Sequence, residues 1–215
     1  MSHLTRDIDT LLTLVTGPLV EPLDLDEVKK HLKVGSTSED TLLDTWISAA
    51  RQHFEEQTGR QVMNATWEYW LAEAPSQLEI ELPKAPLRSV VSISYDDAVG
   101  DPQTFDVANY TVTAPSDPTC PRGRVALVTG SNWPTVTAKP NAMRIRFVAG
   151  YGDARGDVPE LLRAALYLLV AQFHRFRSEV HEAGNGALTT LPIGATTILQ
   201  AYKYAALPKL PPRAW

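Results

Sequence analysis

The stretch "FVAGYGDARGDVPELLRAAL", residues 147–166, joins a segment that alternates like a β-strand to one with helical spacing. Glycine-rich loops that bind phosphate occur between a strand and a helix, so this stretch could be either a ligand-binding site or a structural junction. It lacks the lysine and hydroxyl residue of a P-loop, and a dinucleotide fingerprint needs a parallel βαβ unit, whereas the strands here read as antiparallel. We therefore interpret its first two glycines as a bend, Asp157 as a helix N-cap, and Pro159 and Glu160 as the first turn.

Helical spacing of apolar residues defines the segments on both sides of a central region. Residues 23–34 begin with Asp24 and Glu27 in a capping-box pattern. Residues 39–59 end at a glycine suited to a left-handed cap. The helix that starts in the opening stretch, at about 159–178, is apolar on most faces and is expected to lie at the centre of the core. A short helix is predicted near the C-terminus, in "ATTILQAYKYA".

The central region has the period of two that is typical of strands. Three segments alternate cleanly, at 78–82, 89–95 and 143–147, and three further candidates occur at 66–73, 104–112 and 123–129. Turn-forming Gly, Pro, Asp and Asn residues separate them. Residues 64–149 are therefore predicted to form a small antiparallel β module inserted into a helical domain.

Composition narrows the class of protein. Hydrophobic residues at 44% and charged residues at 21% are ordinary globular values, and a net charge of −5 argues against a surface that grips nucleic acid. The N-terminus carries Asp7 and Asp9 and no clean apolar h-region, so we expect no signal peptide. The longest apolar run, 164–171, is far shorter than the roughly 20 residues needed to span a bilayer. We expect a soluble protein.

No combination of residues predicts catalysis or a cofactor. Cys120 is the only cysteine, and the sequence has no Gly-x-Ser-x-Gly nucleophile elbow. His174 and His181 are seven residues apart, whereas a metal pair on a helix needs a spacing of three or four. A hydrolase using either histidine with Glu182 stays open as a minor alternative. We expect no catalytic, cofactor-binding or metal site.

Several apolar and aromatic residues suggest instead a surface that binds another molecule. Trp67 and Trp70 share a strand, Trp133 lies in a loop, and the chain ends in the Pro-rich "LPKLPPRAW". Such a tail favours an extended conformation and has no evident partner in its own chain. It is typical of a segment that binds another molecule.

The order of these segments resembles the head–tail connector (adaptor) family of tailed bacteriophages, which includes adaptors of gene transfer agents. The resemblance covers about residues 23–205, and its most specific parts are "EEQTGRQV" at the end of the second helix and "AGYG" followed by "DVPELLRAAL". It implies a non-enzymatic protein without cofactors that forms a ring, usually a dodecamer, beneath the portal of the capsid. The protein partners implied are further copies of the same chain, the portal protein and the next tail-side component, which is a stopper or tail terminator. Double-stranded DNA would pass through the ring and be contacted without sequence specificity. The resemblance implies no membrane partner. The location implied is the head–tail junction of a virion or phage-like particle assembled in the bacterial cytoplasm.

Together these arguments predict an α+β fold, a helical bundle core with an inserted small antiparallel β module and an extended C-terminal tail. The expected division is an N-terminal arm at 1–22, a helical adaptor core at 23–63 and 150–205, the β module at 64–149, and a docking tail at 206–215. Charge-poor residues 182–197 are predicted to be a mobile loop that orders on assembly.

Two sets of residues are candidate binding surfaces. The tail residues expected to dock on the portal are Leu207, Pro208, Lys209, Leu210, Pro211, Pro212, Arg213 and Trp215. A closed ring joins two different patches of each subunit, and the charged helix flanks expected to form this contact are Arg51, Glu55, Glu56, Arg163, Arg175 and Arg177. The alternative function is a carbohydrate- or protein-binding module that uses the tryptophans of the β module.

Overall fold

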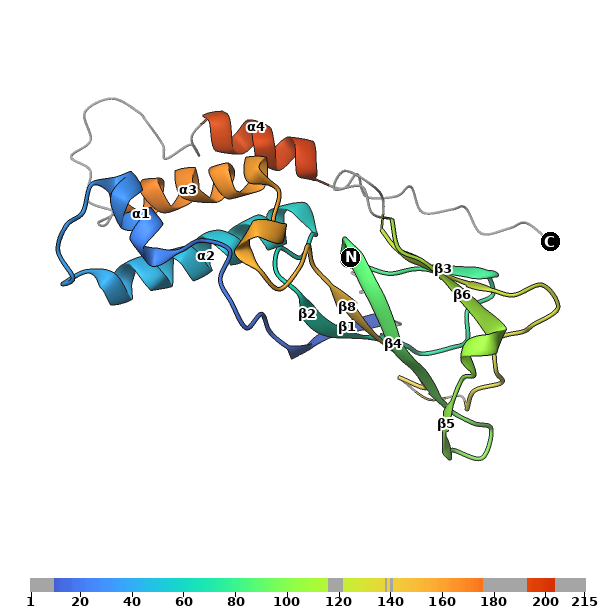
Figure 1. The fold of residues 1–215 in the computed structure, drawn as a ribbon. Coiled ribbons are helices and arrows are strands. Elements are labelled where there is room, and N and C mark those ends of the chain that lie inside the picture. Colours follow the sequence, from blue (N-terminus) through green and yellow to red (C-terminus); the bar gives the residue numbers. More distant parts are fainter. Residues whose placement is uncertain (1–9, 116–121, 138, 140, 176–192, 204–215) are drawn as a thin grey trace, which may run out of the picture.

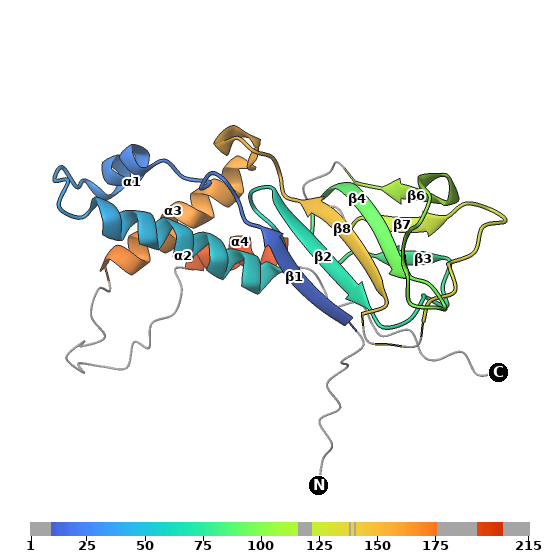
Figure 2. The same ribbon diagram turned by 90° about the horizontal axis from the view of Figure 1, so that it is seen from below.

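The fold combines a helical end and a β-sheet end. The computed structural model describes residues 10–115, 122–137, 139, 141–175 and 193–203. Figures 1 and 2 show the helices gathered at one end of an elongated molecule and the strands at the other. Within the described residues the helices are α1 (Leu25–Leu32), α2 (Asp40–Thr58), α3 (Glu160–Arg175) and α4 (Ile193–Tyr202).

The large sheet corrects the predicted fold class. Five strands lie in the order β1 (Thr10–Thr16), β2 (Ala65–Leu71), β8 (Met143–Ala149), β4 (Leu87–Asp96) and β5 (Pro102–Thr104), and every neighbouring pair is antiparallel. The fold is α+β as expected, but the prediction of a helical bundle core with a small inserted module is wrong. The strands pair over long stretches and bury a core of their own, which the period-two pattern of each separate strand did not reveal.

A second, three-stranded sheet covers this core. Its order is β3 (Glu79–Glu81), β7 (Arg124–Leu127) and β6 (Tyr110–Thr113). Ile80 and Val125 of this sheet are buried in one apolar cluster with Ile93, Ile145 and Phe147 of the large sheet. The two sheets therefore enclose a core between them, as in other two-layer β structures.

The helices enclose the other core around α3. This helix contacts each of the other three, and it buries Leu162, Ala165, Leu166, Leu169 and Val170. Its position confirms the prediction from its broad apolar stripe. The predicted caps of the first two helices are also present: the Asp24 carboxylate accepts from two backbone amides of α1, and Gly59 ends α2 at φ 70°.

The opening stretch forms the crossing from sheet to helix. After β8 the backbone amide of Gly150 donates to Pro86 O at 2.9 Å, and Tyr151 N donates to Val62 O at 3.1 Å. Gly150 has a φ of 141°, and a Cβ there would lie 2.5 Å from Asn64 N, so only glycine fits. The glycines are thus a structural junction.

The role predicted for Asp157 is wrong in detail. Its carboxylate Oδ2 accepts from Ala154 N at 3.0 Å and closes a short 3-10 turn, Arg155–Asp157. The carbonyl of Pro159 is instead the first acceptor of α3, receiving the amides of Leu162 and Arg163. Asp157 ends the 3-10 turn and lies two positions before Pro159, because the extended Val158 intervenes between that turn and the start of α3.

Candidate assembly surfaces

A buried ion-pair network lies where the helices meet the large sheet. Arg51 of α2 donates to Glu21 Oε2 at 2.8 Å through Nε and to Glu55 Oε2 at 2.9 Å through Nη1. The second oxygen of Glu55 accepts from Gln61 Nε2 at 2.8 Å and from Val62 N at 2.9 Å. This network ties α2 to the segments on both sides of it.

Burial sets the electrostatics of the network. Burial raises the pKa of the Glu55 carboxyl, while the charge of Arg51 opposes that rise. Burial lowers the pKa of Arg51, but its hydrogen bond with Glu21 and the nearby carboxylates raise that pKa more, so the guanidinium stays charged. A charge here needs its partner, because an unpaired buried ion is costly.

A groove of about 480 Å³ opens beside this network. It is lined by Leu14, Gly17, Pro18, Arg51, Gln52, Glu55, Glu56, Gln61, Trp67 and Lys84. The Lys84 ammonium lies 4.7 Å from the centre of the Trp67 ring, and burial lowers its pKa against the opposing charges of Glu55 and Glu56. The indole Nε1 of Trp67 donates to Gln61 at 3.1 Å. Lys84, Trp67 and Gln61 of this groove are therefore held by contacts within the same subunit.

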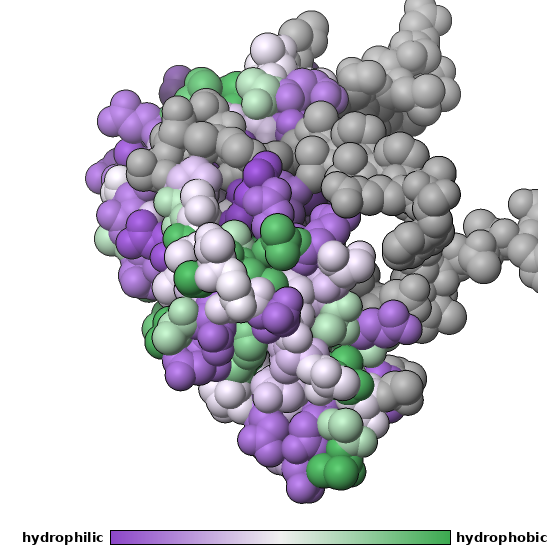
Figure 3. Space-filling view, turned by 90° about the vertical axis from the view of Figure 1, so that its right-hand side faces the viewer, coloured by the Kyte–Doolittle hydropathy of each residue, from purple (hydrophilic) through white to green (hydrophobic). Residues whose placement is uncertain are grey.

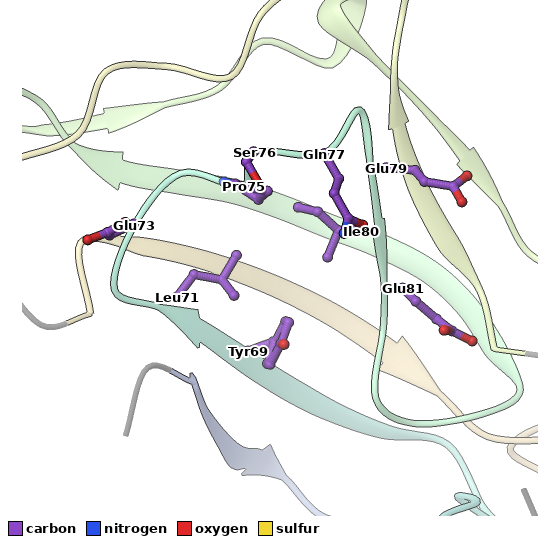
Figure 4. A pocket seen from close by; sticks show the side chains of 9 residues that line it. All are labelled: Tyr69, Leu71, Glu73, Pro75, Ser76, Gln77, Glu79, Ile80 and Glu81. Atoms are coloured by element: carbon purple, nitrogen blue, oxygen red, sulfur yellow. The ribbon is translucent and has the colours of Figure 1, made fainter. Parts of the chain in front are cut away.

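A second hollow, of about 310 Å³, lies between the two sheets at one end of β2. Figure 4 shows its lining: Tyr69, Leu71 and Ile80 supply apolar surface, and Glu73, Glu79 and Glu81 lie at its margins. Glu79 is paired with Arg124 at 3.2 Å. The hollow thus combines a small apolar floor with acidic residues at its margins.

The predicted subunit-contact residues are placed in three ways. Arg51 and Glu55 are buried and bonded within their own subunit. Glu56 and Arg175 are exposed on α2 and α3, and Arg163 is half-buried. Arg177 lies outside the described residues, as do Cys120, His181, Glu182 and the whole tail from Leu207 to Trp215. Of the predicted mobile loop, residues 193–197 begin α4.

The aromatic candidates are already in contact with neighbouring groups. The Arg144 guanidinium lies 5.4 Å from the centre of the Trp70 ring, and Trp133 Nε1 donates to Gln77 O at 2.7 Å. His174 packs edge-on to Trp46 at 5.6 Å, with Nε2 3.6 Å from Glu39. On the sheet end of the molecule, apolar side chains form small separate patches among polar ones (Figure 3).

The end of α4 is held by Arg60. Its Nε donates to Tyr202 O at 2.8 Å, its Nη1 donates to Tyr151 OH at 3.0 Å, and its guanidinium lies over the Tyr202 ring. Arg60 is only 2% exposed. It thereby fixes the C-terminal end of α4.

One surface was missed by the sequence reasoning. Residues 10–20, "TLLTLVTGPLV", carry no charge, and Leu11, Leu14 and Val15 of β1 are 52%, 48% and 44% exposed. The available signal was an uncharged run rich in Leu, Thr and Val that ends at Gly17-Pro18, a pattern typical of a strand followed by a turn. These residues were instead included in the predicted N-terminal arm, 1–22.

The described residues contain neither a metal-binding cluster nor a membrane-spanning helix. No group of three or more His, Cys, Asp or Glu side chains in this part of the chain could hold a metal ion. None of the helices that the structure describes is long and apolar enough to cross a membrane.

Comparison with known proteins confirms the sequence resemblance. Residues 22–98 match the model of the family described as phage gp6-like head-tail connector protein. The match runs from the segment before α1 through β4. No curated protein matches significantly.

Solved structures share the whole fold. A chain in "Virion of native gene transfer agent (GTA) particle" has a TM-score of 0.76 and 23% identity, over 94% of this chain and 100% of the other. Chains in "Neck of empty GTA particle computed with C6 symmetry" and "Neck of native GTA particle computed with C12 symmetry" give TM-scores of 0.74 and 0.71, with 23% and 21% identity and the same coverages. The arrangement of helices and two sheets is therefore one found in gene transfer agent particles.

Proposed function

We propose that this protein is a structural head–tail connector of a tailed phage or gene transfer agent, forming a ring under the portal at the head–tail junction. The match of residues 22–98 to the connector family carries the proposal, and the shared fold with chains of particle necks supports it. The protein acts by shape: it extends the DNA channel and joins head to tail without catalysing a reaction.

The charge of the chain suits a channel wall. A net charge of −5 repels the phosphate backbone, so DNA passes without being held. The partners we propose are neighbouring copies, the portal, and the next tail-side component. In this division the helical segments and the sheets form the ring body, and residues 206–215 reach the portal.

The C-terminal tail is the proposed portal contact. Arg60 anchors Tyr202 at the end of α4, the last described helix before the tail in the sequence. Lys209, Arg213 and Trp215 offer charge and an aromatic anchor of the kind that dominates binding interfaces.

We expect deletion of residues 207–215 to abolish attachment to portal-bearing heads while leaving thermal unfolding of the isolated protein unchanged. A chain whose last nine residues are replaced by Gly and Ser serves as the length-matched control and should fail equally. Attachment can be scored by negative-stain electron microscopy of mixtures with heads. Undiminished attachment of the deleted chain contradicts the role of the tail.

The alternative, a carbohydrate- or protein-binding module, gains no specific support. The Trp67 and Trp70 rings that would serve as platforms are each covered by a cation of the same subunit.

A further inference from the structure

Among the residues that the structure describes, the two open sheets leave four strands with one unpaired edge each. The strand orders make β1 and β5 the edges of the large sheet, and β3 and β6 the edges of the small one. An edge strand presents free N–H and C=O groups to any other strand, and proteins usually blunt such edges with charge, proline or short length.

Two of the four edges are blunted in this way. β3 is three residues long and two of them are glutamates, Glu79 and Glu81. β5 is also three residues long, and it begins with Pro102 directly after the exposed Asp101. Both edges resist addition of a further strand.

The other two edges have no such protection. β1 reads TLLTLVT and β6 reads YTVT, and neither contains a charge or a proline. In β6, Thr111, Val112 and Thr113 are exposed, as are all residues from Leu11 to Thr16 except Leu12. The register of β1 with β2 shifts only after Leu14, so its first five residues form a regular template.

The position and charge of these edges match what a ring contact needs. β1 and β6 belong to different sheets and lie on different sides of the sheet end, β1 toward the helices and β6 away from them (Figures 1 and 2). A ring joins two different patches of each subunit. Copies with a net charge of −5 repel one another, so they meet most easily where the surface is neutral.

We propose that β1 of one subunit pairs with β6 of the next, so that an intersubunit β-sheet closes the ring. The occupant of each free edge is a second copy of this chain. Main-chain hydrogen bonds supply the attraction in such strand addition, and the exposed Leu and Val side chains add apolar contact. The inference rests on the proposed ring function and specifies its subunit contact.

Charge placed on the edges tests the pairing. Leu11→Lys with Thr13→Lys places two positive charges on the β1 edge, and Thr111→Glu with Thr113→Glu places two negative charges on the β6 edge. Each pair alone should lower the fraction of protein in rings roughly tenfold, because a charge would be desolvated against a neutral strand. All four changes in one chain should restore rings through opposite charges. Gln103→Lys with Thr104→Lys, on the blunted β5 edge, is the control and should leave rings intact.

Ring content is measured by native mass spectrometry and negative-stain microscopy, with and without portal, at fixed protein concentration. Intact rings in either single-edge variant, or failure of the four-residue variant to regain rings, overturn the β1–β6 pairing. Either of these results would leave the proposed function as a ring-forming connector intact. A wild-type chain that forms no ring even on the portal defeats the proposed function itself.

A crosslink provides a measurement that does not depend on altered charge. In a Cys120→Ser background, Thr13→Cys and Val112→Cys lie at the centres of the two strands, and would be adjacent in parallel and antiparallel pairing alike. A short thiol-reactive crosslinker should then give a ladder of covalent oligomers, whereas either cysteine alone should give no ladder. Absence of the ladder in assembled rings contradicts the proposal.

Discussion

At the level of single residues, the junction between sheet and helices depends on close backbone approach. The stretch that follows β8 passes directly against residues 62–64, and Asn64 N donates to Gly152 O at 3.0 Å. No side chain fits at Gly150, whose added Cβ would lie within 2.6 Å of backbone atoms of Met63 and Asn64. The two cores are thus joined by main-chain contacts that a single methyl group disturbs.

We therefore expect Gly150→Ala to lower the free energy of unfolding by about 1–3 kcal/mol or more, since it combines a positive φ with a backbone clash. Gly156→Ala is the matched control in the same loop, because an added Cβ there meets nothing within 4 Å. That change should stay within roughly 0.5 kcal/mol. Chemical denaturation of both variants measures the difference, and equal stability of the two would show that the junction yields without cost.

Asp96 gives a second residue-level prediction, in the sheet. Its carboxylate binds Lys139 at 2.9 Å and Arg144 at 3.0 Å. The hydrogen bond from Lys139 is the main cause that lowers the pKa of this carboxyl below 3.8, with the charge of Arg144 adding to it. A lowered pKa means that the ionised form favours the folded state, so its contribution is present above pH 3.8 and is lost as pH falls through the folded pKa.

Asp96→Asn should therefore be less stable than wild type at pH 7, and this difference should shrink as the pH falls below 3.8 and the wild-type carboxyl becomes protonated. Thermal unfolding at pH 7 and across a series of lower pH values measures it. Asp101→Asn, an exposed aspartate in the adjacent turn, serves as the comparison. A difference that stays constant with pH would mean that the Asp96 charge does not act through these pairs.

At the level of elements, α1 depends on its N-cap residue, Asp24, because the helix is only eight residues long. Asp24 Oδ1 accepts from Asp26 N at 3.0 Å and from Glu27 N at 3.4 Å, while Oδ2 pairs with Arg155 Nη1 at 3.2 Å. One side chain therefore both caps the helix and joins it to the turn before α3.

Asp24→Ala should cost about 1 kcal/mol, within the 0.5–2 kcal/mol usual for a lost cap. Asp24→Ser keeps a capping oxygen and loses only the exposed ion pair, so it should cost no more than a few tenths of a kcal/mol. Equilibrium denaturation separates these two values. Equal losses would assign the effect to Arg155 and not to the cap.

Elements with a strong local signal were predictable, and their assembly was not. The cap of α1, the left-handed Gly59 and the apolar stripe of α3 follow from local chemistry. The strands at 78–82, 89–95 and 143–147 were also predicted, but pairing is a long-range property: β8 lies between β2 and β4, which are far from it in sequence. For β1, half-exposed Leu and Thr give no clean alternation, so the strand was missed and the sheet end was underestimated.

The same limit applies to the candidate contact residues. Charge on a helix flank indicates a solvated face, yet Arg51 and Glu55 are only 8% exposed. Arg51 donates a hydrogen bond to Glu21, and Glu55 accepts one from Gln61. Glu21 lies 30 positions before Arg51, and no local pattern reports such a pair. The tail was recognisable only by its lack of a partner, and its docking role is still a prediction.

For the whole molecule, two kinds of subunit contact can be distinguished by salt. Neutral strand edges and charged helix flanks such as Glu56 and Arg175 are both proposed ring contacts. Subunits of charge −5 repel at long range, and added salt weakens that repulsion without affecting main-chain hydrogen bonds between strands. The same salt weakens ion pairs between exposed side chains.

If the strand edges dominate, raising the salt concentration from about 0.05 M to about 0.5 M should increase the fraction of wild-type protein in rings, because the screening length falls well below 10 Å. If the charged flanks dominate, the same change should reduce it. Glu56→Gln with Arg175→Gln separates the two contributions, because it neutralises both flank charges and keeps the net charge at −5. This variant should leave ring content unchanged in the first case and lower it at low salt in the second. Light scattering across the salt series measures the fraction of protein in rings for the wild type and the variant. A wild-type ring that dissolves as salt rises would show that ion pairs, and not the neutral strands, hold the subunits together.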